Sequence, residues 1–457
     1  MRNSMRPGAR GLFLAIAMLA APQLLPAQAP ANRSERLAFW QSLGDTTLVR
    51  LIGAALTANA DIHVATARVE QARSGRLAAA LDLAPTITAS AGYTRQRLPM
   101  AAVPGAVDRL PAGDYWDTGV EAAWELDLFG RVRRGLRGRN AELDASEADA
   151  QDVQVLVAAE LARGYVEMRG LQGQLAVARL NAENQQRTLE LTRQRLDAGR
   201  GTAFDTERAT AQLNLTLAAI PSLESRIASA QYRIGVLVGR APAEIAAELD
   251  AAAPLPSLPD LPAIATPDAI VRNRPDVVSA ERRLAAETAF HRAAKADYLP
   301  RLTLVGGYGT AANDFDRLGG RGTSRFAVGP VITWPLLNLG RVRANADAVA
   351  ARKDAARATY DQAVLRGLEE VAAVTVRYRT ARTRLERLEA AAAASQRAAD
   401  LARLRFEGGI ADFLQVLDAD RTQLATQDLL AQGRMDAATA YVDVYRALRG
   451  RWPTTAE

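Results

Sequence analysis

The chain repeats itself at a fixed distance along its length. The segment from Trp124 to Arg133 recurs from Trp334 to Arg343, with six of ten positions identical, at an offset of 210 residues. At the same offset, Leu191 to Gly199 returns as Leu401 to Gly409, and a third match precedes these at an offset of 215. Self-similarity at a fixed offset is the signature of a duplicated structural unit. The sequence therefore predicts an internal two-fold repeat, and both copies must fold alike.

The repeat divides the chain into two halves and a connection between them. We expect a first repeat over residues 45–240 and a second over residues 268–451. Residues 241–267 hold six prolines, a composition typical of an extended linker.

The N-terminus has the pattern of a secretory signal peptide. Three arginines within the first ten residues precede the apolar run 11–20, which is too short to span a bilayer. Small residues then predict cleavage between 29 and 31, so that residues 1–29 form the signal peptide. The alternative is a single N-terminal anchor. Removal of the three arginines lowers the net charge from +6 to about +3.

Several kinds of chemistry have no residues to support them. The sequence contains no cysteine, which excludes disulfides, thiolate metal sites and lipid attachment through an N-terminal cysteine. His63 and His291 match no metal-ligand spacing, and no phosphate-binding Gly-x-x-x-x-Gly-Lys-Ser/Thr loop occurs. The modest charge after processing is weak support for nucleic-acid binding. We therefore expect no enzymatic activity, no cofactor, no metal site and no nucleic-acid partner.

Regions nearly free of proline predict two long helical hairpins, over about 131–238 and 341–450. Their alanine, leucine, arginine, glutamate and glutamine residues are strong helix formers. The first arm of the second hairpin, about Val342 to Phe406, would be roughly 100 Å long. Alanine-rich stripes favour close packing against neighbouring helices over a solvated spacer. We expect Pro221 to kink its helix because proline removes a backbone donor and clashes with the preceding turn.

Four segments of alternating polarity lie between the helical regions. They form one pair at about 86–97 and 116–128, and a second pair at about 301–312 and 323–338. Alternation over ~10 residues with an aromatic residue near one end fits a transmembrane β-strand. A half-buried antiparallel sheet in a soluble domain alternates in the same way. The strands alone leave both interpretations open.

Closure of the sheet links the membrane interpretation to oligomerisation. The smallest membrane barrels need ~8 strands, and the chain supplies four. An open sheet edge in hydrocarbon costs several kcal/mol for each unpaired backbone group. Strands that span a membrane therefore require several copies of the chain.

At this point the sequence resembles a known family, the TolC-type outer-membrane efflux channels, which are the outer membrane factors of tripartite efflux systems. The resemblance covers about Leu51 to Arg451. It rests on the duplication, on the two strand-to-helix junctions that begin at Trp124 and Trp334, on the segment around Pro221, and on the run Arg405 to Ala419. The last run is the most specific.

The resemblance implies an α+β membrane protein. It implies a homotrimer in which four strands per chain form a 12-stranded transmembrane β-barrel, continued by a long α-helical barrel. The implied place is the cell outer membrane, with the helices extending into the periplasm. The implied function is passive export, as the exit duct of a tripartite efflux or type I secretion assembly. The implied partners are a periplasmic adaptor (membrane fusion) protein, an inner-membrane pump and outer-membrane lipid.

The resemblance also implies two functional sites at the hairpin ends. The positions that line the closed periplasmic aperture correspond to Asp205, Asp418 and Gln415. A ring of carboxylates at a narrow aperture favours cations, as acidic rings do in other pores. The hairpin tips that dock the adaptor correspond to Gly199, Arg200, Gly201, Gly408 and Gly409.

The sequence departs from the family pattern at two aperture positions, and Asp205 has one alternative role. Gln415 stands where some members have an aspartate, and Ala411 stands where they have an arginine, so their gate ion pair is not reproduced. Arg200 and Arg208 are the candidates to replace it. The alternative role for Asp205 is that of a helix N-cap after a glycine turn, which is compatible with the first.

A second function from a different class remains at this stage. A soluble periplasmic scaffold or adaptor would use the helical hairpins for docking and would place the strand pairs in one compact domain. The aromatic-ended apolar faces of all four strands favour the exit duct over this alternative.

Overall fold

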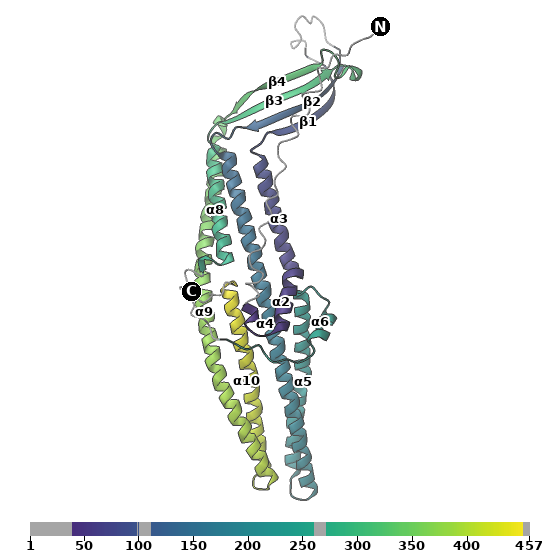
Figure 1. Ribbon diagram of the computed structural model, residues 1–457, viewed down its shortest axis with the longest axis vertical. Helices are drawn as coiled ribbons and strands as arrows, with labels where there is room; N and C mark the ends of the chain where they lie inside the picture. Colours follow the sequence, from purple (N-terminus) through teal and green to yellow (C-terminus); the bar gives the residue numbers. More distant parts are fainter. Residues whose placement is uncertain (1–38, 98, 100–110, 260–270, 451–457) are drawn as a thin grey trace.

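A computed structural model describes residues 39–97, 99, 111–259 and 271–450. This part of the chain is mostly helical, with one small antiparallel sheet at one end of a long helical stem (Figure 1). The turns of two helical hairpins lie at the opposite end of the stem (Figure 1). The expected signal peptide 1–29 and its cleavage site lie outside the described residues.

Two hairpins of long helices form the stem. The first consists of α4 (Arg131–Asp197) and α5 (Ala203–Leu237), and the second of α9 (Leu339–Glu407) and α10 (Phe413–Ala447). With 67 and 69 residues, α4 and α9 are each about 100 Å long. α5 is one helix through Pro221, and the kink expected there stays a prediction.

Three shorter helices lie beside the long ones. They are α2 (Thr46–Ala58), α3 (Ala60–Leu81) and α8 (Pro275–Ala296). Helices α3 and α8 run along α4 towards the sheet, and each leads into a strand (Figure 1). Within the described ranges, no single helix has the length and apolar composition to cross a membrane; α2 and α3 reach that standard only together, across a bend of 41°.

The proline-rich linker differs from the expectation. Residues Pro242–Leu249 form a helix, α6, so the prediction of an extended linker was wrong for this stretch. Pro242 occupies the first turn, where a missing backbone N–H costs no helical hydrogen bond. Ile245 and Leu249, one turn apart, are buried against the core. Residues 260–267 of the linker lie outside the described residues.

The four strands pair antiparallel in the order β1-β2-β3-β4. The register places Tyr93 opposite Trp116, and it aligns Val120, Tyr308 and Phe326 across the other three strands. Apolar residues of all four strands therefore share one face, and that face is exposed in the single chain. The strands are β1 (Thr86–Gln96), β2 (Gly113–Glu125), β3 (Arg301–Ala312) and β4 (Ser324–Thr333).

Two strands end earlier than expected. β4 ends at Thr333 and not at 338, because Pro335 has no N–H to donate and the chain enters the 3₁₀ turn η3 (Leu336–Asn338). β2 ends at Glu125 and not at 128, because the chain turns into α4 at Gly130, whose φ is +74°. The predicted strand limits at 128 and 338 were wrong, because local turns end the two strands earlier.

The main hydrophobic core lies halfway along the stem, where α2, α4 and α10 meet. Its largest side chains are aromatic, and the rings of Trp40 and Tyr445 lie 4.4 Å apart. The hydroxyl of the buried Tyr165 donates to Asp45 Oδ2 at 2.7 Å, which satisfies its polar atom. Burial is the main cause that raises the pKa of Tyr165 to about 12.

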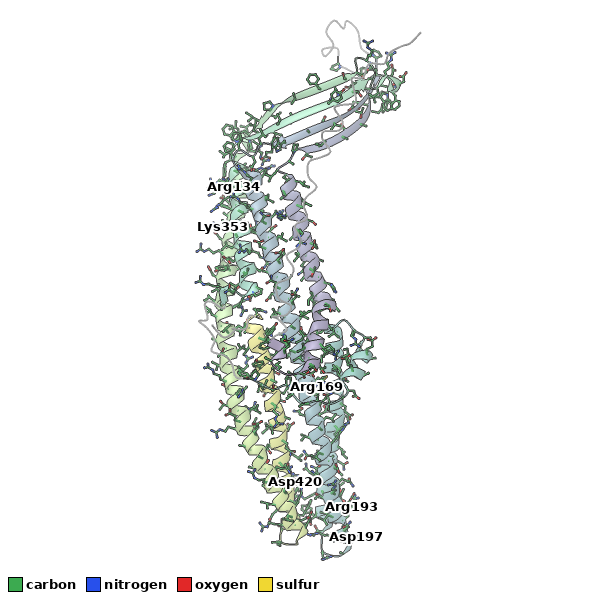
Figure 2. All side chains as sticks on the ribbon, viewed as in Figure 1. Arg134, Arg169, Arg193, Asp197, Lys353 and Asp420 are labelled. Atoms are coloured by element: carbon green, nitrogen blue, oxygen red, sulfur yellow. The ribbon has the colours of Figure 1, made fainter. Side chains whose placement is uncertain are left out.

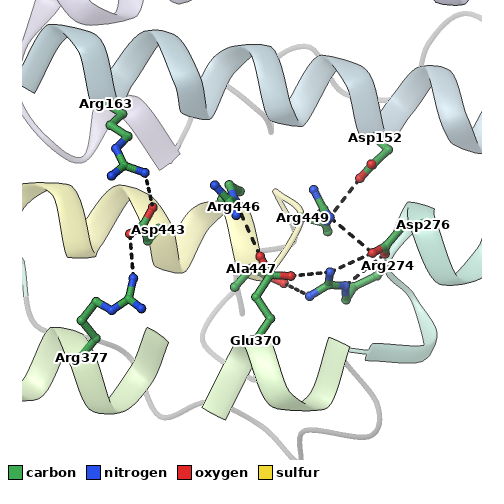
Figure 3. Close-up of polar contacts among 10 residues, drawn as sticks. All are labelled: Asp152, Arg163, Arg274, Asp276, Glu370, Arg377, Asp443, Arg446, Ala447 and Arg449. Atoms are coloured by element: carbon green, nitrogen blue, oxygen red, sulfur yellow. Dashed lines mark hydrogen bonds and ion pairs between the residues drawn. The ribbon is translucent and has the colours of Figure 1, made fainter. Parts of the chain in front are cut away.

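A buried arginine fastens the upper end of α10 to this core. Arg274 directly precedes α8, and its side chain is 2% exposed. Its Nη1 donates to the carbonyl of Ala447 at 2.6 Å, and its Nη2 forms ion pairs with Asp276 at 2.8 Å and Glu370 at 2.7 Å (Figure 3). One guanidinium therefore joins α8, α9 and the end of α10. A buried charge with several good partners is costly to disrupt.

Candidate functional site

The turns at the ends of the two hairpins are built alike. Gly199 and Gly409 follow α4 and α9 with φ of +67° and +72°, a conformation that favours glycine. After Gly199, the N–H of Arg200 donates to the carbonyl of Arg195 at 2.8 Å. After Gly409, the N–H of Ile410 donates to the carbonyl of Arg405 at 2.9 Å. Both helices therefore end in glycine-based stops that reverse the chain sharply.

Asp205 lies in the first turn of α5, but Thr202 is the N-cap of that helix. The Thr202 hydroxyl accepts from the N–H of Asp205 at 3.2 Å and donates to Asp205 Oδ2 at 2.7 Å. The N-cap role suggested for Asp205 was wrong, because Thr202 holds that position and Asp205 is the third helical residue, whose N–H the cap accepts. The second hairpin has the same arrangement with other residues, since Asp412 Oδ1 accepts from the N–H of Gln415 at 3.0 Å.

Asp418 lies one turn further along α10. Its side chain is exposed, and within the described part of the chain it has no ion-pair partner. Gln415 is also exposed on this side of the hairpin end. The structure therefore leaves Asp418 and Gln415 on the surface of a single chain, where only another copy or solvent can meet them.

Neither arginine suggested as a substitute gate partner pairs with an aperture carboxylate inside one chain. Arg208 lies over the ring of Phe204, with 5.2 Å between its guanidinium carbon and the ring centroid. Arg200 is exposed at the tip, without an ion pair among the described residues. In the same ranges, no group of three or more histidine or carboxylate side chains is placed to hold a metal ion.

A buried ion pair near the second tip was missed by the sequence reasoning. Arg403 Nη2 lies 2.8 Å from Asp420 Oδ1, and it also donates to Gln423 Oε1 at 3.0 Å. Asp420 is 6% exposed and lies near the lower end of the stem (Figure 2). Burial raises the pKa of Asp420, and the Arg403 charge offsets this only in part. The signal was present in the sequence, because Phe413, Asp420 and Gln423 share the apolar face of α10.

The two hairpins contact each other just above their tips. Arg195 of α4 donates to the carbonyl of Phe406 at the end of α9, and its guanidinium lies 3.9 Å from the centroid of the Phe406 ring. Arg421 Nε donates to Gln212 Oε1 at 3.1 Å, between α10 and α5. A small apolar cluster underlies these contacts; it comprises Ala182, Leu189, Ala209, Leu213, Phe406, Phe413, Val416 and Leu417. The tips of one chain are therefore held together as one unit.

The tips also expose large apolar side chains. Phe204, Ile410 and Leu414 follow the two turns and are exposed in the single chain. Apolar residues at such tips have no core to enter, so they are available to a partner. Sequence reasoning named the glycines here and missed these side chains.

The junction between sheet and stem is stabilised by local acidic residues. Asp127 accepts the N–H groups of Val132 and Arg133, at 3.1 and 2.9 Å, at the start of α4. Burial alone would raise the pKa of Asp127, but these hydrogen bonds and the Arg133 guanidinium hold it below its usual value. Glu125 forms an ion pair with Arg131 at 2.6 Å. The first turn of α4 is therefore anchored to the end of β2.

The arrangement of a small exposed sheet on a stem of long hairpins is that of the outer-membrane channel proteins. The chain superposes on the outer-membrane channel OprN with a TM-score of 0.85 and 38% sequence identity, covering 90% of this chain and 92% of that one. It has the same fold as the outer membrane protein VceC of Vibrio cholerae, with a TM-score of 0.83 at 24% identity, over 91% and 98% of the two chains.

Sequence comparison gives the family. The model of the family described as "Outer membrane efflux protein" matches residues 51–240 and 266–450. Outer membrane protein OprJ of Pseudomonas aeruginosa is 31% identical over 417 residues, which are 90% of this chain and 86% of that protein. Toluene efflux pump outer membrane protein TtgI of Pseudomonas putida is 30% identical over 410 residues, 89% of this chain and 86% of TtgI.

The chain belongs to the outer membrane efflux protein family. It is therefore an outer-membrane component of an efflux system, and the resemblance drawn from the sequence is confirmed. This family consists of channel proteins and not of enzymes. The alternative of a soluble periplasmic scaffold or adaptor is set aside by the same matches.

Proposed function

We propose that three copies of this chain assemble into a duct, with a 12-stranded transmembrane β-barrel continued by an α-helical barrel. The observation that carries this proposal is the four-stranded sheet, whose apolar face is exposed on every strand. Its outer strands, β1 and β4, each have one edge without a partner among the described residues. Such edges cannot remain open in hydrocarbon, and three sheets of four strands close the ring.

Aromatic residues near both ends of the strands support a membrane-spanning sheet. At the end away from the stem, the ring centroids of Tyr93 and Trp116 lie 4.5 Å apart. At the stem end, Trp124 and Trp334 are partly exposed. Eight residues separate Trp116 from Trp124 along β2, a rise of about 26 Å. In a strand tilted by about 40°, this rise corresponds to about 20 Å along the membrane normal, close to the apolar band of about 25 Å between the aromatic girdles of membrane barrels.

The two halves of the chain support a duplicated origin. The element order helix, two strands and two long helices occurs from α3 to α5 and again from α8 to α10. We assign 45–240 and 268–451 to the two repeats and 241–267 to the linker, with residues 1–29 removed on export. A duplicated unit contributes two strand pairs and two hairpins to each third of the duct.

In this assembly the duct is the exit of a tripartite efflux or type I secretion system. The helical stem extends into the periplasm, and transport through the duct is passive, driven by an inner-membrane pump. The name of TtgI, a toluene efflux pump outer membrane protein, supports small molecules as the substrates. Outer-membrane lipid surrounds the barrel.

The hairpin tips dock a periplasmic adaptor protein. Gly199, Gly201, Gly408 and Gly409 form the turns, and Arg200 is exposed between them. The exposed apolar residues at both tips are the second element that a docking partner requires; they are Phe204, Ile410 and Leu414.

Asp205, Asp418 and Gln415 line the periplasmic aperture. All three lie within the first two turns after a tip, and Asp418 has no partner inside the described part of its own chain. Three symmetric copies place a ring of carboxylates at a narrow passage, which attracts cations.

Conductance in a planar lipid bilayer tests the proposal. Purified, folded protein should insert as discrete channels with reproducible single-channel conductance and a preference for cations. Folded protein that binds the bilayer and never conducts contradicts the duct.

A further inference from the structure

A ring of exposed apolar side chains marks the junction between the sheet and the stem. The most exposed member is Leu337, at 99%. The others come from three of the four connections between strands and helices, namely β2–α4, α8–β3 and β4–α9. We call this set the apolar collar: Leu128, Phe129, Leu299, Leu336, Leu337 and Leu339. Clustered apolar residues on a surface mark a binding face for protein or lipid.

Basic side chains lie directly beyond the apolar collar, on the first turns of the stem. We call these four exposed residues the basic collar: Arg137, Arg292, Lys295 and Arg341. They come from three different helices, α4, α8 and α9. In the described part of the chain, none of the four has an ion-pair partner.

The packing of the helices brings the basic collar to one level. Arg134 Nη1 donates to the carbonyl of Arg292 at 3.2 Å, so the start of α4 lies beside the last turns of α8; Figure 2 shows Arg134 at the sheet end of the stem. Arg352 pairs with Glu287 at 3.8 Å between α9 and the antiparallel α8. Arg341 precedes Arg352 by eleven residues, which places it closer to the sheet. Because α8 runs in the opposite direction, Arg341 is level with the end of α8, near Lys295.

Three carboxylates at this junction are already engaged with other cations. Asp127 lies 3.0 Å from Arg133 Nε, and Asp297 lies 2.6 Å from Arg301 Nη2. Glu125 is bound by Arg131. Asp82, at the end of α3, is exposed and has no ion pair in the described ranges, so the four positive charges of the basic collar are offset only in part.

The two collars fit an amphipathic anion. Arg341 follows Leu339 by two helical residues, about 3 Å along the axis. The headgroup region of a bilayer is several ångströms thick on each side of the hydrocarbon, so the apolar collar reaches acyl chains while the basic collar reaches phosphates. Excess arginine and lysine at this depth favour anionic over zwitterionic lipid.

We propose that the two collars together bind anionic phospholipids of the membrane leaflet on the helical-stem side. The inference rests on the proposed membrane-spanning duct and adds to it the class of lipid and the leaflet. The phosphate of a phosphatidylglycerol headgroup meets the basic collar, and its acyl chains cover the apolar collar.

Lipid retention by the purified trimer tests this inference. Protein in detergent is titrated with phosphatidylglycerol or phosphatidylcholine at constant ionic strength, and bound lipid is counted by native mass spectrometry. We expect a roughly tenfold preference for phosphatidylglycerol in the unmodified protein. The triple variant R292Q/K295Q/R341Q should bind both lipids nearly equally.

A matched variant separates the collar from overall charge. The variant R379Q/R387Q/R397Q also removes three positive charges, but from exposed arginines of α9 far from the sheet. None of these arginines has an ion pair in the described ranges. This variant should keep the full preference. An unchanged preference in the collar variant, or an equal loss in the matched variant, overturns the inference.

The same sample distinguishes failure of the lipid inference from failure of the proposed duct. Conductance and trimer mass are measured on it first. A conducting trimer without lipid preference overturns the collar inference alone. Protein that neither trimerises nor conducts overturns the proposed duct, and the lipid inference falls with it.

Discussion

The indole N–H of Trp124 donates to the main-chain carbonyl of Leu83 at 2.9 Å, across the junction between β2 and the end of α3. The second half of the chain repeats this contact, since Trp334 Nε1 donates to the carbonyl of Tyr298 at 3.0 Å. In each half, the hydrogen bond joins the segment that leads from a helix into the first strand of a pair to the stem end of the second strand. The orientation of the sheet on the stem is therefore fixed by the same device in both halves.

Replacing Trp124 or Trp334 with phenylalanine should loosen this junction. The aromatic ring remains while the hydrogen bond is lost, so each change should destabilise the fold by about 1 kcal/mol. Thermal unfolding of the purified protein measures the effect. Trp116→Phe is the control, because the indole of Trp116 makes ring contacts at the other end of the sheet. Equal losses in all three variants would contradict the role of the carbonyl contacts.

Gly138 allows α4 and α8 to approach closely. A Cβ at Gly138 would lie 2.3 Å from Phe290 Cε1, so Gly138→Ala should destabilise the protein by about 1–3 kcal/mol. Gly135, one turn earlier in α4, has open space around it, and Gly135→Ala should stabilise the helix by up to about 1 kcal/mol. Denaturant unfolding compares the pair. Equal changes of stability in the same direction for both substitutions would contradict the close approach of α4 and α8 at Gly138.

Asp152 should make stability depend on pH. Burial raises the pKa of Asp152 to about 6, and the Arg449 guanidinium, with Nε 3.2 Å from the carboxylate, offsets this only in part because the contact lacks hydrogen-bond geometry. The folded state therefore holds the proton more tightly than the unfolded state. The resulting stabilisation is complete below about pH 4 and is lost as pH rises through about 6.

Asp152→Asn isolates this contribution. The variant removes the titrating group, so its stability should vary less between pH 4 and pH 7 than that of the unmodified protein. The difference should be on the order of 2–3 kcal/mol, from about 1.4 kcal/mol per pKa unit. Asp149→Asn, on the same helix, is the control, because Asp149 accepts from Ser279 and pairs with Arg283 at the surface. A pH profile that Asp152→Asn leaves unchanged would contradict the assignment.

Asp418→Asn tests the aperture. Loss of three carboxylates from a ring should reduce the cation selectivity of single channels and weaken block by multivalent cations. Reversal potentials under a salt gradient measure the selectivity. Asp428→Asn, two to three turns further along α10, provides a comparison with the same charge change. Unchanged selectivity in correctly assembled Asp418→Asn channels would remove Asp418 from the aperture.

Much of the secondary structure follows from local sequence, but the buried polar contacts do not. Composition and proline spacing predict a helix from about Val342 to Phe406, and α9 spans Leu339–Glu407. The Arg274 contacts join residues far apart in sequence, including Glu370 and Ala447, and no local pattern encodes them. Asp420 was missed although it shares the apolar face of α10, because its partner Arg403 lies on the other arm of the hairpin and sequence spacing does not reveal that contact.

The ends of β2 and β4 show a second limit. Alternating polarity continued past both strands, so periodicity alone placed their ends too late. Pro335 and the positive φ of Gly130 end the pairing, which makes turn chemistry the better guide to a strand end than hydrophobic alternation. At the tips, the sequence located the turn before Asp205 correctly, but the N-cap is Thr202, three residues earlier, and its hydroxyl accepts the N–H of Asp205.

This chain, we propose, forms a trimeric duct in the outer membrane. Membrane fractionation followed by an unboiled denaturing gel tests it most directly, on protein exported with its own N-terminus. We expect a band in the outer-membrane fraction near three times the monomer mass, which collapses to the monomer on heating. If the outer-membrane fraction contains only monomer, and a crosslinker joins no further chain to it, the trimer and the closed barrel are both contradicted.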